Sequence, residues 1–254
     1  MPDLAPASGI PGLDFRQAAL FGLALSWVAY VAGAQLAWAL TQRTAPGALR
    51  PDWLVQAGRL IYYVLFPYLL LLRGAGLLAA ALGLLGPAPL SHSLLGWSTG
   101  WLEGGLWAAG FSLGTWLILA WSARIVRQTA GPAMLTLLPR GWVLVREVVF
   151  QQAHWAFYRA VFTVWVGTYA ALFVSLLVVV AEVAADPRTW RDLRDPARTS
   201  AMIITAAMAC ASSAVFLFTG NLWLTMAMHL VTLALLGPSM ALARAPARSA
   251  EPPA

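Results

Sequence analysis

Residues 163–185 read TVWVGTYAALFVSLLVVVAEVAA, and Glu182 is the one charged side chain among them. About 20 apolar residues are enough for a helix to cross the hydrocarbon core of a bilayer, which is roughly 30 Å thick. The whole composition agrees with a membrane location. Of the 254 residues, 60% are hydrophobic and 10% are charged, whereas soluble domains carry about 25% charged residues. The sequence therefore predicts an integral membrane protein.

Further apolar runs on both sides of this stretch predict an all-α polytopic transmembrane helix bundle with about seven spans. The predicted spans are about 17–41, 54–72, 105–123, 142–162, 163–185, 199–218 and 221–238. They form a single membrane domain, 1–254, in which 239–254 is predicted to be a disordered Pro/Ala-rich tail. Pro67 is expected to kink the second span. The GxxxG spacing of Gly110 and Gly114 is expected to allow close helix contact in the third.

The segment 74–86, GAGLLAAALGLLG, is apolar but short, so an interfacial or re-entrant piece is expected there. The basic residues then set the orientation. All 16 are Arg, and about seven spans leave only Arg16, Arg73 and Arg159 on one side of the membrane. The positive-inside rule therefore predicts the N-terminus outside and the C-terminus in the cytoplasm. The Arg-only, Ala-rich usage points to the inner (cytoplasmic) membrane of a bacterium.

Composition also excludes one class of membrane protein and one class of partner. The chain has no Lys, which excludes a seven-helix retinal protein, because retinal is held as a Schiff base on a Lys amine. The net charge of +6 is explained by Arg residues at helix ends, so no nucleic acid is expected. The expected partners are the lipid bilayer and a membrane peptide or a helix of another protein. Cys210 is the sole cysteine and cannot form an internal disulfide.

The fourth predicted span carries a polar stripe. Glu147, Gln151, His154 and Tyr158 follow one another at spacings of four, three and four residues. This spacing places them on one face of a helix. Polar and ionisable groups within a span usually face the bundle interior, because exposure to lipid is unfavourable. The stripe therefore predicts an interior polar site, in which Gln151 supports the ionisable residues or joins two helices.

A further ionisable residue, His229, lies near the middle of the last predicted span. Counting from the cytoplasmic helix ends places Glu147, His229 and His154 at depths of about 7, 13 and 18 Å. The three side chains could converge if the fourth and seventh spans pack together. Taken alone, His229 is more typical of an interhelical hydrogen bond. Glu182 is expected near the cytoplasmic end of its span, where it snorkels or pairs with Arg188.

Several chemistries fit a Glu beside one or two His. Such a group can activate water while a second polar group holds the developing oxyanion. Glu147, His154 and His229 could instead be the two-His, one-carboxylate ligand set of a catalytic zinc. Two facing His could also clamp a haem. No HExxH motif is present, so spacing alone assigns neither a metal nor a cofactor.

The run R-E-V-V-F-Q-Q at 146–152 resembles a degenerate form of the E-E-x-x-x-R motif of the CPBP (CAAX protease and bacteriocin-processing, or Abi) family. The stretch T-G-N-L-W-L-T-M-A-M-H at 219–229 is similar to the last motif of that family, in which a mid-helix His follows a short turn. The order of the two motifs also agrees, and the match covers about residues 140–238. The resemblance implies a CAAX-type intramembrane endopeptidase.

In that family, motif carboxylates activate the water that attacks a peptide bond, and His and Asn side chains help to bind the oxyanion. The resemblance implies that Glu147 is the general base and that His229 is the last-motif His. His154 would supply a further imidazole to the oxyanion or metal site, with Gln151 in a supporting position.

The chain departs from the family motifs at several positions. Arg146 stands where the first Glu belongs, Gln151 where the Arg belongs, and Leu233 where Asn or Asp usually follows the last His. The His of the middle F-x-x-x-H motif has no counterpart in 199–218. These departures favour an alternative, a non-catalytic membrane scaffold or regulatory partner that uses the same polar site. A haem or metal carrier is the third and least favoured hypothesis.

Overall fold

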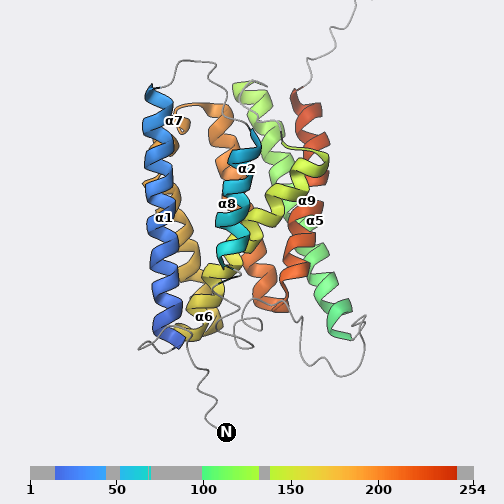
Figure 1. The fold of residues 1–254 in the computed structure, drawn as a ribbon. Coiled ribbons are helices and arrows are strands. Elements are labelled where there is room, and N and C mark those ends of the chain that lie inside the picture. Colours follow the sequence, from blue (N-terminus) through green and yellow to red (C-terminus); the bar gives the residue numbers. More distant parts are fainter. Residues whose placement is uncertain (1–14, 44–51, 68, 70–98, 132–137, 245–254) are drawn as a thin grey trace, which may run out of the picture.

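The described part of this computed structural model comprises residues 15–43, 52–67, 69, 99–131 and 138–244, and it contains helices and no strand. The helices are α1 (Phe15–Arg43), α2 (Asp52–Leu60), the π-helix η1 (Ile61–Leu65), α5 (Thr99–Ala130), α6 (Gly141–Ala185), α7 (Pro187–Asp192), α8 (Pro196–Thr219) and α9 (Leu222–Arg244). The long helices stand side by side as a bundle (Figure 1). The predicted all-α polytopic fold class is confirmed.

Five of the described helices, namely α1, α5, α6, α8 and α9, are long and apolar enough to cross a membrane. The protein is therefore a multi-pass membrane protein that contacts lipid. Within 54–72, the described residues form α2, η1 and a short helical continuation to Pro67. The predicted interfacial segment 74–86 lies outside the described residues.

The predicted disordered tail begins too early. Helix α9 continues to Arg244, so residues 239–244 are helical, and the rest of the predicted tail lies outside the described residues. Pro238 sits inside the helix without ending it, because neighbouring helices can support the backbone around a proline in a membrane bundle.

Helix α6 consists of two arms joined at Gly167. This glycine has φ 76° and ψ 165°, a conformation that essentially only glycine adopts. Figure 1 shows α6 crossing the bundle and returning behind α1. The contact between His154 and Glu182 requires this reversal, because a straight helix would separate the two residues by about 40 Å. The predicted boundary between the fourth and fifth spans, at 162–163, lies close to the observed turn.

The first arm of α6 packs against α8 and α9, and α5 packs against the same two helices, so the four helices share one apolar core. Core side chains such as Val148, Met208 and Met228 are no more than 2% exposed. Hydrogen bonds between small polar side chains join the same helices, as when Ser112 Oγ of α5 lies 2.9 Å from Thr232 Oγ1 of α9. Such bonds are typical of helix interfaces in membranes.

The close approach of α5 to a neighbouring helix occurs at Gly104. A Cβ added there would lie 2.7 Å from Leu224 Cδ1 of α9, whereas an added Cβ at Gly110 or Gly114 meets nothing within 4 Å. The prediction that Gly110 and Gly114 mediate close helix contact is therefore wrong within the described bundle. The two glycines line an apolar groove of about 660 Å³ between α5 and α8. Helix α8 presents small side chains there, including Cys210, so the two helices leave space between them.

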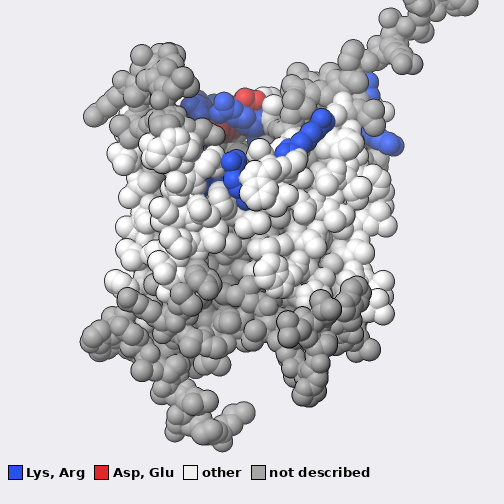
Figure 2. Space-filling view, turned by 45° about the vertical axis from the view of Figure 1, so that its right-hand side comes forward, with Lys and Arg blue, Asp and Glu red and all other residues white. Residues whose placement is uncertain are grey.

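Charged side chains gather at one end of the bundle. Figure 2 shows the Arg side chains in its upper part, and Figure 1 shows that α1 and α9 finish at this end while α2 and α8 begin there. Helix α1 begins at the opposite end. The N-outside, C-inside orientation stays a prediction of the positive-inside rule for this arrangement.

Replacing Gly167 by Ala is expected to destabilise the protein by about 1–3 kcal/mol, because its backbone conformation strains any L-residue. The added methyl group meets nothing within 4 Å, so the effect isolates backbone strain from packing. Gly110→Ala is the matched control, since it also has free space around it but sits in a helix, where Ala is better than Gly by up to about 1 kcal/mol. Detergent-induced unfolding followed by Trp fluorescence measures both. Equal stabilities of the two variants would contradict the role of Gly167.

Candidate functional site

Glu147, the predicted general base, is held by two guanidinium groups. Arg59 of α2 donates to both of its carboxylate oxygens, at 2.8 and 2.5 Å. Arg146 adds a third bond, to Oε1, at 3.1 Å. Bidentate pairs of Arg with a carboxylate are among the strongest hydrogen-bonded pairs in proteins. Nearby cations favour the ionised carboxylate, so this environment makes Glu147 a weak base toward water.

His154, expected beside Glu147, pairs instead with Glu182. Its Nε2 lies 2.9 Å from Glu182 Oε2, and the two side chains are only 5% and 4% exposed. Tyr158 donates its hydroxyl to Glu182 Oε1, and the Tyr62 hydroxyl lies 3.3 Å from the same oxygen. One buried carboxylate therefore joins both arms of α6 and η1.

Three tyrosine rings surround the imidazole of His154. The ring centroids of Tyr62, Tyr63 and Tyr158 lie 5.4, 4.9 and 4.5 Å from the imidazole centroid. Tyr62 and Tyr63 are adjacent in sequence, and the wide turn of η1 allows both rings to contact α6. The Tyr62 hydroxyl also lies 3.1 Å from the carbonyl oxygen of Ser26 in α1. Short π-helical segments of this kind are frequent at functional sites.

The expectation that Glu182 snorkels or pairs with Arg188 is wrong. Arg188 pairs with Asp186, to which its Nη2 donates at 2.7 Å. The backbone N–H of Arg188 donates to the same carboxylate at 2.9 Å, so Asp186 caps α7. Burial raises the pKa of the Asp186 carboxyl, but the hydrogen bonds from Arg188 outweigh this effect and hold its pKa below the ordinary value. Arg188 is therefore engaged by the capping residue Asp186, and Glu182 pairs with groups in the bundle interior instead.

His229 belongs to a different pair. The amide Nε2 of Gln152 donates to His229 Nδ1 at 2.9 Å. Trp155 stacks on the imidazole with a centroid separation of 5.7 Å and an interplanar angle of 6°. Gln152 and His229 are 0% and 1% exposed. This is the interhelical role that is typical of a single mid-membrane His.

Glu147, His154 and His229 therefore lie in three separate groups, and the predicted convergence is wrong. Gln152 and His154 are two residues apart, so they point to nearly opposite sides of α6. Among the residues that the structure describes, no three His, Cys, Asp or Glu side chains gather as metal ligands would. The two imidazoles also have different partners, so they do not face each other across a haem. Gln151 is half-buried and has no hydrogen-bond partner in the described bundle.

Sequence reasoning missed the burial of Arg159, which is 1% exposed and is the largest fully buried side chain of the described bundle. Its guanidinium lies 4.7 Å above the ring of Phe216 in α8. None of its three nitrogens has a hydrogen-bond partner among the described residues. Arginine stays charged in proteins, and burying an unpaired charge is unfavourable. The position of this Arg within an apolar run was the sequence feature that could have predicted its burial.

Glu182→Ala is expected to destabilise the protein more than Glu147→Ala does. The first change removes the shared acceptor of three buried or partly buried groups, and breaking a buried pair costs about 3–5 kcal/mol. The Arg59–Glu147 pair is 32% and 20% exposed, so the Arg59 guanidinium can still reach water or headgroups when Glu147 is removed, and a smaller loss is expected. Detergent-induced unfolding of the two variants makes the comparison. A larger loss for Glu147→Ala would overturn the ranking of the two networks.

Arg159→Met is expected to stabilise the protein by about 1–4 kcal/mol, because a flexible apolar side chain can keep the contact with Phe216 without a buried charge. Arg159→Lys retains the charge and should show no gain. The midpoint of thermal unfolding in a mild detergent measures both variants. A loss of stability in Arg159→Met would mean that the guanidinium has an anionic partner beyond the described residues.

No protein-family model matches the chain, and no curated protein or solved structure shows significant similarity to it. The CPBP resemblance therefore rests on residues 146–152 and 219–229 alone. A proposal about function can use these two motifs and the geometry of the site.

Proposed function

We propose that the protein is a divergent relative of the CPBP proteases that binds a membrane peptide or a helix of another protein without hydrolysing it. The state of Glu147 carries this proposal. Both of its oxygens accept hydrogen bonds from Arg59 and Arg146. A general base needs a carboxylate oxygen that is free to take a proton from water. Two flanking guanidinium groups oppose that transfer, because they stabilise the ionised carboxylate.

The other polar residues of the resemblance support the same conclusion. His154 is engaged by Glu182, and His229 by Gln152. Each of these pairs joins separate segments of the bundle. In the proposed protein, the groups that would act on a substrate in a protease instead hold segments of the bundle together.

The surface beside the Arg59–Glu147 pair is the proposed docking side. Helix α2 and η1 expose large apolar side chains around this pair, including Trp53 at 67%, Leu60 at 50% and Ile61 at 55%. Within a membrane, such side chains pack against lipid or against another helix. A partly exposed ion pair among them favours a partner helix that carries a polar group, because polar side chains in a bilayer seek one another.

A second candidate function is hydrolysis with His154 as the base. Glu182 holds the imidazole through Nε2, and Nδ1 has no hydrogen-bond partner in the described residues. A carboxylate that orients a His in this way is a common arrangement for a general base. Because His154 is 4% exposed, a substrate would reach Nδ1 only after η1 moves away from α6.

Hydrolysis assays in lipid nanodiscs separate the two candidates. The purified chain is offered prenylated CAAX-type peptides and unmodified membrane peptides, and mass spectrometry detects cleavage. No cleavage is expected from the wild-type protein or from Glu147→Gln. Cleavage that is abolished by Glu147→Gln would restore the protease mechanism of the resemblance. Cleavage that survives Glu147→Gln but is lost in a His154→Ala variant that keeps the wild-type unfolding midpoint would establish the second candidate, and Gln151→Ala serves as a control on the same helix.

Binding of a partner at α2 is tested by a separate measurement. A photocrosslinking residue is placed at Leu60, next to Arg59, and at Leu113 of α5, which is similarly exposed, at 53% against 50% for Leu60. In native membranes we expect a discrete crosslinked protein from position 60 and none from position 113. Arg59→Gln should reduce the crosslink. Equal crosslinking at both positions would contradict docking at α2.

A further inference from the structure

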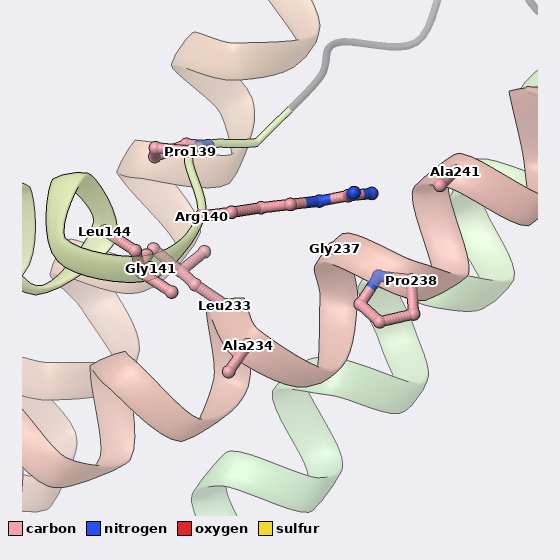
Figure 3. Close-up of a pocket in the computed structure, with 9 residues that line it drawn as sticks. All are labelled: Pro139, Arg140, Gly141, Leu144, Leu233, Ala234, Gly237, Pro238 and Ala241. Atoms are coloured by element: carbon pink, nitrogen blue, oxygen red, sulfur yellow. The ribbon is translucent and has the colours of Figure 1, made fainter.

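A groove of about 750 Å³ lies between the start of α6 and the last turns of α9. Its volume falls in the range of about 300–1,000 Å³ that is usual for ligand sites. Apolar residues of both helices line it, among them Leu144 of α6 and Leu233 and Ala241 of α9. Arg140 is the one charged residue in the lining. Figure 3 shows its side chain extending from the start of α6 toward α9.

Arg140 is available to an external anion. Its side chain is exposed, and no acidic residue within the described ranges pairs with it. It begins α6 at the Arg-rich end of the bundle, which Figure 2 shows in its upper part. A basic side chain at the mouth of an apolar groove between membrane helices complements a lipid that has a negative headgroup.

Backbone groups add hydrogen-bonding capacity to both walls of this groove. Arg140 is the N-cap of α6 and forms no side-chain cap, so the N–H groups of the first turn lack the acceptor that an N-cap side chain usually provides. On the facing wall, Pro238 has no N–H, so the carbonyl of Ala234 lacks its usual helical donor. The groove therefore offers donors for a phosphate and an acceptor for a headgroup hydroxyl.

We propose that this groove binds an anionic phospholipid whose phosphate lies at Arg140 and whose acyl chain follows the apolar lining between α6 and α9. A free phosphate would leave the apolar walls unfilled, and a zwitterionic lipid would bring its own cation to the site. Phosphatidylglycerol has both the negative charge that complements the donors of one wall and the hydroxyl groups that complement the acceptor of the other. The proposal is independent of the proposed function, because Glu147 and its partners do not line the groove.

The test measures lipid binding to the full chain by native mass spectrometry. Protein released from nanodiscs into a mild detergent is titrated with phosphatidylglycerol or with phosphatidylcholine of the same acyl chains. We expect tighter binding of phosphatidylglycerol. Arg140→Gln should weaken it about five-fold, the effect of one basic residue near the membrane surface. Arg140→Lys should keep most of the affinity, because the charge remains.

Arg194→Gln is the matched charge control, since Arg194 is exposed at the same end of the bundle, in the turn between α7 and α8. It should leave the affinity unchanged. Equal losses in Arg140→Gln and Arg194→Gln would overturn the site in favour of a general surface-charge effect. Equal affinities of wild-type protein for the two lipids would also overturn it.

Ala234→Phe tests the α9 wall of the site. Ala234 is exposed and lines the groove, so a larger side chain can fill the space without crowding the core. Binding of both lipids should weaken several-fold while the midpoint of thermal unfolding without added lipid stays unchanged. Unchanged lipid binding would place the lipid elsewhere. A change in oligomeric state would show that a second copy of the chain, and not a lipid, occupies the groove.

Discussion

The carboxylate of Glu182 is the group on which the polar interior of this protein depends. It lies in an apolar run and is only 3% exposed, so it must be paired within the protein or be neutral. Its two oxygens contact His154, Tyr158 and Tyr62. Through these contacts the second arm of α6 is tied to the first, and η1 is tied to both. The turn at Gly167 makes this possible, because it returns the chain antiparallel to itself.

Pairing within the chain also engages the other polar residues that the CPBP resemblance singles out, and this bears on function. A hydrolytic site keeps some polar groups free until the substrate arrives, so that they can stabilise charge that develops in the transition state. Here Glu147 is bonded to Arg59 and Arg146, and His229 to Gln152. Partners within the chain therefore engage most of the groups that a CPBP-like mechanism would use, which is the ground of the proposed binding function.

The two ends of the bundle differ in their charge. Arg side chains concentrate at one end (Figure 2), where a negatively charged membrane surface would attract them. The groove beside Arg140 lies at this end, and its walls are apolar. The interior polar pairs position helices, whereas Arg140 is exposed and pairs with no acidic residue of the described ranges. The proposed lipid contact would thus lie between α6 and α9, apart from the proposed protein contact at α2 and η1.

Properties that depend on short stretches of sequence were determined by the sequence itself: the membrane class, the helical fold, most span positions and the polar face of α6 around His154. They follow from run length and from the helical period, which neighbouring residues set. The partners of those polar residues were decided by tertiary structure. Glu182 reaches His154 because Gly167 reverses the chain, and Arg59 reaches Glu147 from a helix 88 positions away in the sequence. No local pattern encodes such distances, because they depend on how separate helices pack.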